Sequence, residues 1–326
     1  MEYLLIDDAL IMNRRRKCLW IGVVITLSGI VGIAQFQRSG GGGESGPIVW
    51  GEGGIAINED TVQTARETAS HSTGTPNWAN SPDFGSDVFT FARAIFKSGP
   101  NENQGFGRGW RLGWWVDYPD ADLNLSYRLQ QMTSMKVNPD GRVLKLTDST
   151  LTDFPFLFME HPGYMYLADA EADALRNYLL NGGALLVIDF WNTREWDGFD
   201  AQMKRVLPGR TWIDLPLSHP VFHCVFDLSG PMRMLQVPTI QFWNSAHDPH
   251  DPESRIHRVD RGPGSDEMHV RAWMDDQGRI MAIAIHNSDI SDAWEREGES
   301  DQYFQTFSER IAYPLGINLV VYLMTH

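Results

Sequence analysis

The stretch FPFLFMEHPGYMYLADAEADALRNYLLNGGALLVIDF, residues 154–190, decides the fold. Its two ends, 154–160 and 184–190, are apolar runs without alternation, which is typical of strands buried on both faces. Between them, apolar residues over 167–179 recur at helical spacing, and Gly182 then ends the helix. A strand, a helix and a second buried strand form a βαβ unit, so the sequence predicts a parallel sheet with a right-handed crossover.

The sequence on either side of this unit predicts the other elements of one α/β domain over 86–326. They are strands over 88–96 and 142–146, a helix over 199–206, and a hairpin over 269–287. The C-terminal residues have helical apolar spacing that Pro314 and Gly316 interrupt. No internal repeat is present, so one domain fits the length better than two.

The N-terminal segment, 1–36, has the pattern of an export signal. A cationic block, Arg14 to Lys17, precedes an uncharged apolar run from Cys18 to Ala34. The run has roughly 17 residues, the lower limit for a membrane-spanning helix, so an uncleaved anchor and a cleaved signal peptide both stay open. The basic block predicts that its own side stays in the cytoplasm and that everything after Ala34 faces outward. Met12 is a second candidate for the start of the chain.

Residues 37–85 are rich in Gly, Ser, Pro and Asn, apart from a candidate short helix between Glu59 and Ala69. This composition predicts a flexible linker between the membrane-directed segment and the folded domain. The expected location is therefore the cell envelope: either anchored in the inner membrane with the domain outside the cytoplasm, or secreted to the periplasm.

Composition and charge exclude several classes of protein. The chain of 326 residues has 42 acidic and 27 basic residues, a net charge of −15, which argues against a nucleic-acid-binding surface. The 42% hydrophobic content argues against general disorder. Of the two cysteines, only Cys224 lies in the domain, which excludes an internal disulfide there and a cysteine-based zinc site. We expect Cys224 to be a buried, inert thiol.

Two loops at the ends of the βαβ strands predict a ligand site. In open parallel sheets, ligands bind outside the carboxyl ends of the strands. The first loop, 160–164, and the second, 189–197, follow consecutive strands and should lie side by side. Together they offer Glu160, His161, Asp189, Trp191, Asn192 and Arg194 to one cleft. The alternative is that these polar residues only cap the following helices.

A third candidate region, 105–125, combines glycines, tryptophans and acids. Gly105, Gly107 and Gly109 lack the Lys and Ser/Thr of a phosphate loop, so no nucleotide cofactor is expected. Indole rings beside carboxylates are a common way to hold a sugar. The residues in that pattern are Trp110, Trp114 and Trp115 with Asp117 and Asp122. The alternative is that the tryptophans belong to the core and that Asp122 caps a helix.

Two weaker patterns suggest metal ligands. His219 and His223 have the i, i+4 spacing of imidazoles that share a metal on a helix, but Pro220 lies between them, and a turn is the alternative. Asn287 and Asp289 offer alternate oxygens like the start of a calcium loop, without its glycine, and an Asx-rich turn is the alternative.

Five motifs in order resemble the family DUF4159, a domain of unknown function. They are WWVDYPDADLNL (114–125), FPFLFMEHPGY with ALRNYLLNGGALLVIDF (154–190), SHPVFH (218–223), IHNSDISDAWE (285–295) and PLGINLVVY (314–322). The resemblance implies a fold similar to class I glutamine amidotransferases, a flavodoxin-like parallel sandwich. It implies no catalytic residues, and the Gly-x-Cys-x-Gly elbow of amidotransferases is missing here.

These patterns support three hypotheses about function. The leading one is an exported or membrane-tethered envelope protein whose domain binds a ligand without catalysis, with a glycan as the candidate ligand. The second is a hydrolase, with or without a metal, that acts on an envelope or carbohydrate substrate. The third is a structural or assembly partner of an envelope protein, with no small-molecule site. The membrane is the expected partner of the N-terminal segment in each case.

Overall fold

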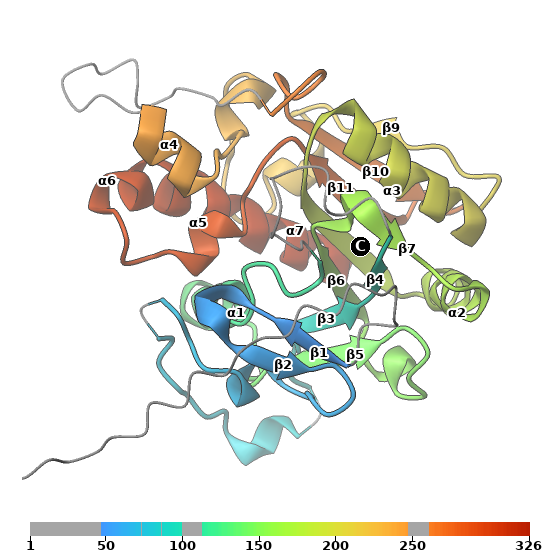
Figure 1. Ribbon diagram of the computed structural model, residues 1–326, viewed down its shortest axis with the longest axis horizontal. Coiled ribbons are helices and arrows are strands. Elements are labelled where there is room, and N and C mark those ends of the chain that lie inside the picture. The colour runs from blue at the N-terminus through green and yellow to red at the C-terminus, as the bar shows by residue number, and fades with distance from the viewer. Residues whose placement is uncertain (1–46, 73, 86, 100–112, 247–260) are drawn as a thin grey trace, which may run out of the picture. The chain divides into compact units, whose positions relative to one another are not determined.

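The central sheet of the computed structural model has seven strands in the order β5-β3-β6-β8-β11-β10-β9 (Figure 1). The strands are β3 (Ala92–Ile95), β5 (Arg142–Lys145), β6 (Phe156–Glu160), β8 (Ala184–Phe190), β9 (Ile213–Asp214), β10 (His269–Met274) and β11 (Ile280–His286). β5, β3, β6, β8 and β11 are parallel, and β10 and β9 extend one edge in antiparallel pairing. The protein therefore has an α/β fold with a mainly parallel sheet.

The structure describes residues 47–72, 74–85, 87–99, 113–246 and 261–326, all of which belong to one unit, Ser45–His326. The expected export segment, 1–36, lies outside these residues, as do Trp110 and the glycines at 105, 107 and 109. Within the described residues, no helix has both the length and the apolar character needed to cross a bilayer.

The predicted βαβ unit is confirmed as β6, α2 (Asp169–Leu180) and β8, with β6 and β8 parallel. Both strands are buried on both faces, as their unbroken apolar runs indicate: Phe156 and Phe158 pack into one core cluster, and the residues between and after them pack into the other. α2 and α3 (Asn192–Val206) cover one face of the sheet. α1 (Asp120–Met132) and α7 (Tyr313–Thr325) cover the other.

Helix α1 was not among the elements predicted from sequence, because buried polar residues mask its apolar stripe. Ala121, Leu125 and Leu129 form that stripe, but Asp122, Asn124 and Ser126 are buried beside it. These polar groups bond to distant parts of the chain: Asn124 Nδ2 donates to the carbonyl of Trp294 at 2.7 Å. The partners that make the helix fit its site are therefore invisible in the local pattern.

Part of the predicted linker packs onto the domain. β1 (Ile48–Trp50) and β2 (Ala56–Asn58) form a hairpin. Ile57, Val62 and Ala65 are buried in the core, and the backbone N–H of Val143 on β5 donates to the carbonyl of Gln63 at 2.9 Å. This differs from a flexible tether over the whole of 37–85. A few apolar residues among many glycines and serines are enough to anchor the segment once a sheet edge is available.

The C-terminal region is helical without the predicted interruption. α6 (Asp301–Tyr303), a π-helical segment (Phe304–Ala312) and α7 follow one another directly. Pro314 lies where the π-helical segment passes into α7. A Cβ on Gly316 would lie 2.6 Å from Trp294, so this glycine permits close packing instead of ending the helix.

The remaining elements support the sheet or its edge. They are α4 (Ile240–Ala246), α5 (Asp292–Glu295) and the two-stranded sheet of β4 (Lys97–Ser98) and β7 (Met165–Tyr166). The hairpin predicted over 269–287 is confirmed as β10 and β11. The chain passes from β3 outward to β5 and then returns to β6 on the other side of β3, so the strand order reverses beside β3. This is the switch point at which open α/β sheets bind ligands.

Candidate functional site

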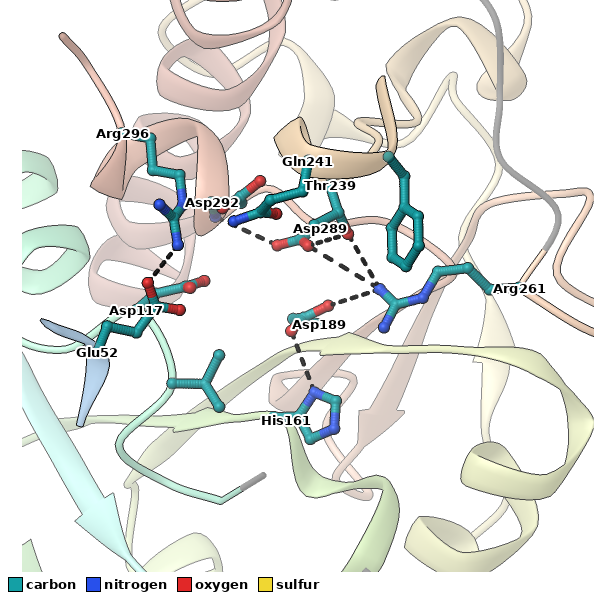
Figure 2. A pocket seen from close by; sticks show the side chains of 12 residues that line it. Glu52, Asp117, His161, Asp189, Thr239, Gln241, Arg261, Asp289, Asp292 and Arg296 are labelled. Atoms are coloured by element: carbon teal, nitrogen blue, oxygen red, sulfur yellow. Dashed lines mark hydrogen bonds and ion pairs between the residues drawn. The ribbon is translucent and has the colours of Figure 1, made fainter. Parts of the chain in front are cut away.

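A cavity of about 270 Å³ lies at the carboxyl edge of the sheet. β6 and β8 supply His161 and Asp189, and the segment after β11 supplies Asp289 and Asp292. Figure 2 shows these side chains around the same space. The full lining is Glu52, Val116, Asp117, His161, Asp189, Thr239, Gln241, Phe242, Arg261, Asp289, Asp292 and Arg296. Segments far apart in the sequence therefore form one polar, charged pocket.

The backbone around the cavity is unusual. Five non-glycine residues among those described have a positive φ, between 50° and 64°: Asp117, His161, Asp189, Asn192 and Asn287. The first three line the cavity, and the other two brace its wall. Asn287 Oδ1 accepts from the N–H of Asn192 at 2.8 Å, and Asn192 Nδ2 donates to the carbonyl of Arg261 at 3.0 Å. Such conformations cost free energy and concentrate at functional sites.

His161 and Asp189 form a buried pair, with His161 Nδ1 3.1 Å from Asp189 Oδ2. Trp191 Nε1 donates to Asp189 Oδ1 at 2.8 Å, and Arg261 Nη1 lies 3.6 Å from the same oxygen. Burial works to raise the pKa of Asp189, but the hydrogen bond and charge of His161, with that of Arg261, outweigh it and lower the pKa. The pKa of His161 is raised: burial opposes this shift, and the bond to Asp189 overcomes it. Both shifts favour the imidazolium form of His161 and the carboxylate form of Asp189.

The other acids of the site have the opposite tendency. Burial, reinforced by neighbouring carboxylates, raises the pKa of Asp117, Glu160 and Asp289 well above the usual range. Burial also raises the pKa of Asp292 to about 6, although Arg296 works against the shift. Carboxyl groups with lowered and with raised pKa values thus lie side by side in one cavity, an arrangement found where groups exchange protons or bind cations.

Three groups of acids and histidines have ligand atoms within 4.8 Å of one another, in the part of the chain that the structure describes. They are Asp117–Glu160–Asp189, Asp117–Asp292–Glu295 and Glu52–His71–Glu295. The groups that include Glu295 already have a cation: Arg296 Nε lies 2.8 Å from Glu295 Oε2 and 2.8 Å from Asp292 Oδ1, and Arg296 also pairs with Glu52. Asp117 belongs to two of the three groups.

The structure brings together five of the residues chosen from the sequence: Asp117, Glu160, His161, Asp189 and Asp289. Glu160 is fully buried beneath the cavity, where Ser291 Oγ donates to its Oε1 at 2.8 Å. Trp191 is buried and supports Asp189, so its ring is not open to a ligand. The second predicted loop, 189–197, is mostly helix α3. Asn192 caps that helix, accepting from the N–H groups of Arg194 at 3.0 Å and Glu195 at 3.2 Å.

Other predicted site residues lie elsewhere. Arg194 stacks near Tyr164, 5.6 Å from its ring, beside a second hollow. Asp122 pairs with Arg93 and does not line the cavity. Trp114 and Trp115 are buried in the core, and Trp114 Nε1 donates to Glu59 at 2.6 Å. The indole faces of these two residues are therefore structural.

The two weak metal patterns have other roles. His219 and His223 flank a single 3-10 turn, Pro220–Phe222, and do not lie on one α-helix. His223 uses both ring nitrogens, with Asp227 at 2.6 Å and the carbonyl of Leu217 at 2.7 Å. Asn287 uses its whole amide, donating to the carbonyls of Gly264 and Glu267 and accepting from Asn192. Asp289, in contrast, lines the cavity. Cys224 is exposed, contrary to the expectation of a buried thiol.

Several important residues were not selected from sequence. Arg93 is fully buried, and an arginine inside the apolar run 88–96 was the signal that could have identified it. Asp292 and Glu295 follow the Asx-rich segment that contains Asn287 and Asp289, but neither was selected as a ligand. Glu52, Thr239 and Arg261 reach the cavity from three separate segments, and no local pattern marks them.

Comparison with known proteins agrees with the motifs. No curated protein matches the chain. The family model described as "Domain of unknown function (DUF4159)" matches residues 108–324, which is more than half of the chain and includes every strand of the central sheet except β3 and all of the cavity lining except Glu52. The chain therefore belongs to the DUF4159 family.

Proposed function

We propose that this chain is an envelope protein, tethered or exported through its N-terminal segment, whose α/β domain binds a small polar ligand in the strand-end cavity. The observation that carries the proposal is the convergence of the left-handed residues Asp117, His161 and Asp189 on that cavity. Maintaining strained backbone at three separate positions costs stability, which is most readily explained by a binding requirement.

The position of the cavity supports the same proposal. It lies at the carboxyl ends of parallel strands, and its volume suits a ligand of about one sugar ring. Carboxylates such as Asp289 and Asp292 accept hydrogen bonds from hydroxyl groups, and Arg261 and Arg296 can donate them. A hydroxyl-rich ligand such as one residue of an envelope glycan fits this lining. Recognition would then rest on hydrogen bonds and not on the predicted tryptophan stacking.

The strand order also supports a more specific fold. Across the sheet, the parallel strands lie in the order β5, β3, β6, β8 and β11. Numbered by their order along the chain, these five strands are the second, first, third, fourth and fifth. Flavodoxin-like sheets have the order 2-1-3-4-5, and we extend the proposal to a flavodoxin-like fold of the class I glutamine amidotransferase kind.

Thermal unfolding with sugars tests the proposal. The full-length chain, purified in detergent, is heated with glucose or N-acetylglucosamine at millimolar concentration. We expect one of them to raise the melting temperature of the wild type but not that of Asp189→Asn, a variant that keeps the side-chain shape and tolerates the positive φ. The control is Asp227→Asn, an exposed acid outside the cavity. An equal rise in the melting temperature of Asp189→Asn would mean that the sugar binds outside the cavity. If neither sugar raises the melting temperature of the wild type, a glycan ligand of this kind is excluded.

A second candidate function is hydrolysis, favoured by the His161–Asp189 pair. The ionised Asp189 lies next to Asp117 and Glu160, whose raised pKa values keep a proton available. This candidate is tested with p-nitrophenyl glycosides and p-nitrophenyl acetate. Release of nitrophenol that is lost in His161→Gln supports it, whereas release no faster than in buffer excludes these substrate classes. The charged cavity does not support the third hypothesis, a purely structural partner.

A further inference from the structure

Asp117 is an unusual buried acid. Its side chain is 3% exposed and lines the cavity, yet no hydrogen bond or ion pair to its carboxylate occurs among the described residues. Oδ2 is completely shielded from solvent and has no partner. Its backbone has φ 57°, which directs the residue inward from the turn before α1. A buried, unpartnered carboxylate is costly unless something neutralises it.

The other two acids of the group Asp117–Glu160–Asp189 also have oxygen lone pairs without a partner. Glu160 and Asp189 each have an oxygen within 4.8 Å of Asp117 and of each other. Glu160 Oε2 is also buried without a hydrogen-bond partner, and the closest cation, Arg93 Nη2, is 3.9 Å away. Asp189 accepts from His161 and Trp191, and its two oxygens retain further lone pairs.

The arginines nearby are engaged by other groups. Arg93 makes its short contacts to Asp122, at 2.5 and 3.0 Å, and to the carbonyls of Trp114 and Val116. Arg296 is shared by Glu52, Asp292, Glu295 and Glu299. Arg261 Nη1 donates to Thr239 at 3.1 Å and approaches only Asp189 of the three acids. The group Asp117–Glu160–Asp189 is therefore short of positive charge.

We propose that Asp117, Glu160 and Asp189 together bind one divalent metal ion of the class that prefers oxygen ligands: Mg²⁺, Mn²⁺ or Ca²⁺. Three carboxylates and no thiolate are the donor set of such ions. The adjoining cavity has room for the water or ligand oxygens that complete their coordination. The inference rests on the proposed function, because it places the ion at the wall of the same ligand cavity.

Neighbouring residues have positioning roles in this proposal. His161 holds Asp189 through its Nδ1, the kind of outer hydrogen bond that orients a ligating carboxylate. Ser291 fixes Glu160 through Oε1 and leaves Oε2 toward the shared space. Arg93 binds the carbonyls of Trp114 and Val116 and so fixes the turn that carries Asp117. All three ligands are preorganised, which lowers the cost of binding.

The test is a titration of MnCl₂ followed by electron paramagnetic resonance, in which bound Mn²⁺ loses the signal of the free ion. The full-length chain in detergent is first dialysed against EDTA and then freed of it. We expect one Mn²⁺ per chain and displacement by MgCl₂ or CaCl₂. Asp117→Asn and Glu160→Gln should each weaken binding at least about 10-fold, the smallest effect expected even for groups one step removed from a metal.

Two further variants make the result specific. Asp227→Asn removes an exposed acid and should leave the affinity unchanged. Asp292→Asn removes an acid of the cavity that is paired with Arg296 and should have a smaller effect than Asp117→Asn. The proposal is overturned if the folded wild type binds no Mn²⁺ at millimolar concentration, or if Asp292→Asn loses binding and Glu160→Gln keeps it. Sugar binding is measured separately in metal-free protein, so failure of one proposal is distinguishable from failure of the other.

Discussion

Asp117 and Asp122 lie five positions apart in the sequence and are buried to the same extent, yet they have opposite surroundings. Asp122 receives the guanidinium of Arg93 through Nε at 3.0 Å and Nη2 at 2.5 Å. Asp117 has no partner among the described residues and faces the cavity. Burial raises the pKa of both acids, but well above the usual range only for Asp117. The comparison teaches that two acids with similar burial can differ in whether a cation compensates their charge.

The largest effect on stability is expected from a substitution in the Arg93–Asp122 pair. Arg93→Met leaves Asp122 as an uncompensated buried charge and removes two hydrogen bonds to carbonyls, so we expect a loss of about 3–5 kcal/mol in the free energy of unfolding. Denaturation with urea measures it. The double variant Arg93→Met/Asp122→Leu removes both charges and should recover much of the loss. A single variant within about 1 kcal/mol of wild type would mean that the pair is not structural.

The unpaired acid should respond in the opposite direction. Burial raises the pKa of Asp117, so the wild type must take up a proton to bury this acid without a partner, whereas Asp117→Asn is neutral and keeps a residue type that adopts positive φ. The metal-free variant should therefore gain about 1 kcal/mol of stability or more. The same urea experiment measures the gain, with Asp227→Asn as the matched surface control. Destabilisation of metal-free Asp117→Asn would show that the carboxylate has a structural role and would erase the contrast with Asp122.

Asp292 is intermediate between Asp117 and Asp122, because it is buried and has Arg296 as a partner but its pKa is still raised. Its contribution to the free energy of unfolding should therefore depend on pH. Its pKa in the folded protein is raised to about 6, so its proton stabilises the fold fully below the unfolded value and this stabilisation is lost as pH rises through about 6. Between pH 6 and pH 8 the loss from this one group is about 0.4 kcal/mol. Urea denaturation of both proteins measures it: the change in the free energy of unfolding between the two pH values should differ between wild type and Asp292→Asn by this amount. Equal pH dependence in the two proteins would contradict the raised pKa.

The smallest effect is expected far from the cavity. His223 is exposed and its pKa is raised by the hydrogen bonds to Asp227 and the carbonyl of Leu217. Because solvent screens this pair, His223→Gln should leave both the melting temperature and the affinity for Mn²⁺ unchanged. Loss of Mn²⁺ binding in this variant would move the metal site to the His219–His223 turn.

Local sequence patterns correctly predicted the strands whose apolar residues form an unbroken or alternating run. β6, β8 and the β10–β11 hairpin lie where the apolar runs place them, since a short apolar run bounded by turn residues, or an alternating one, indicates a strand. α1 was missed because Asp122 and Asn124 face the core through partners distant in sequence. The segment around β1 and β2 was interpreted as part of a linker because its anchor, the edge of β5, is also distant.

The same division holds for the site. His161 and Asp189 could be predicted together because they follow consecutive strands of one βαβ unit, and a parallel sheet brings such ends to one edge. Asp117 was selected because tryptophans lie near it in the sequence, but Trp114 and Trp115 are core residues and do not form a binding surface with it. No pattern could pair it with Glu160, because the two approach each other only when the turn before α1 packs against β6.

The sequence by itself determined the class of fold, the family and the edge of the sheet at which a site should lie, since these depend on periodicity and on the order of strands along the chain. Only the tertiary structure decided which acids have partners. Whether a buried carboxylate is neutralised depends on distances of a few ångströms to groups such as Arg93 and Arg296, which enter from other segments. Coulomb energies and desolvation change steeply over such distances, and sequence spacing does not encode them.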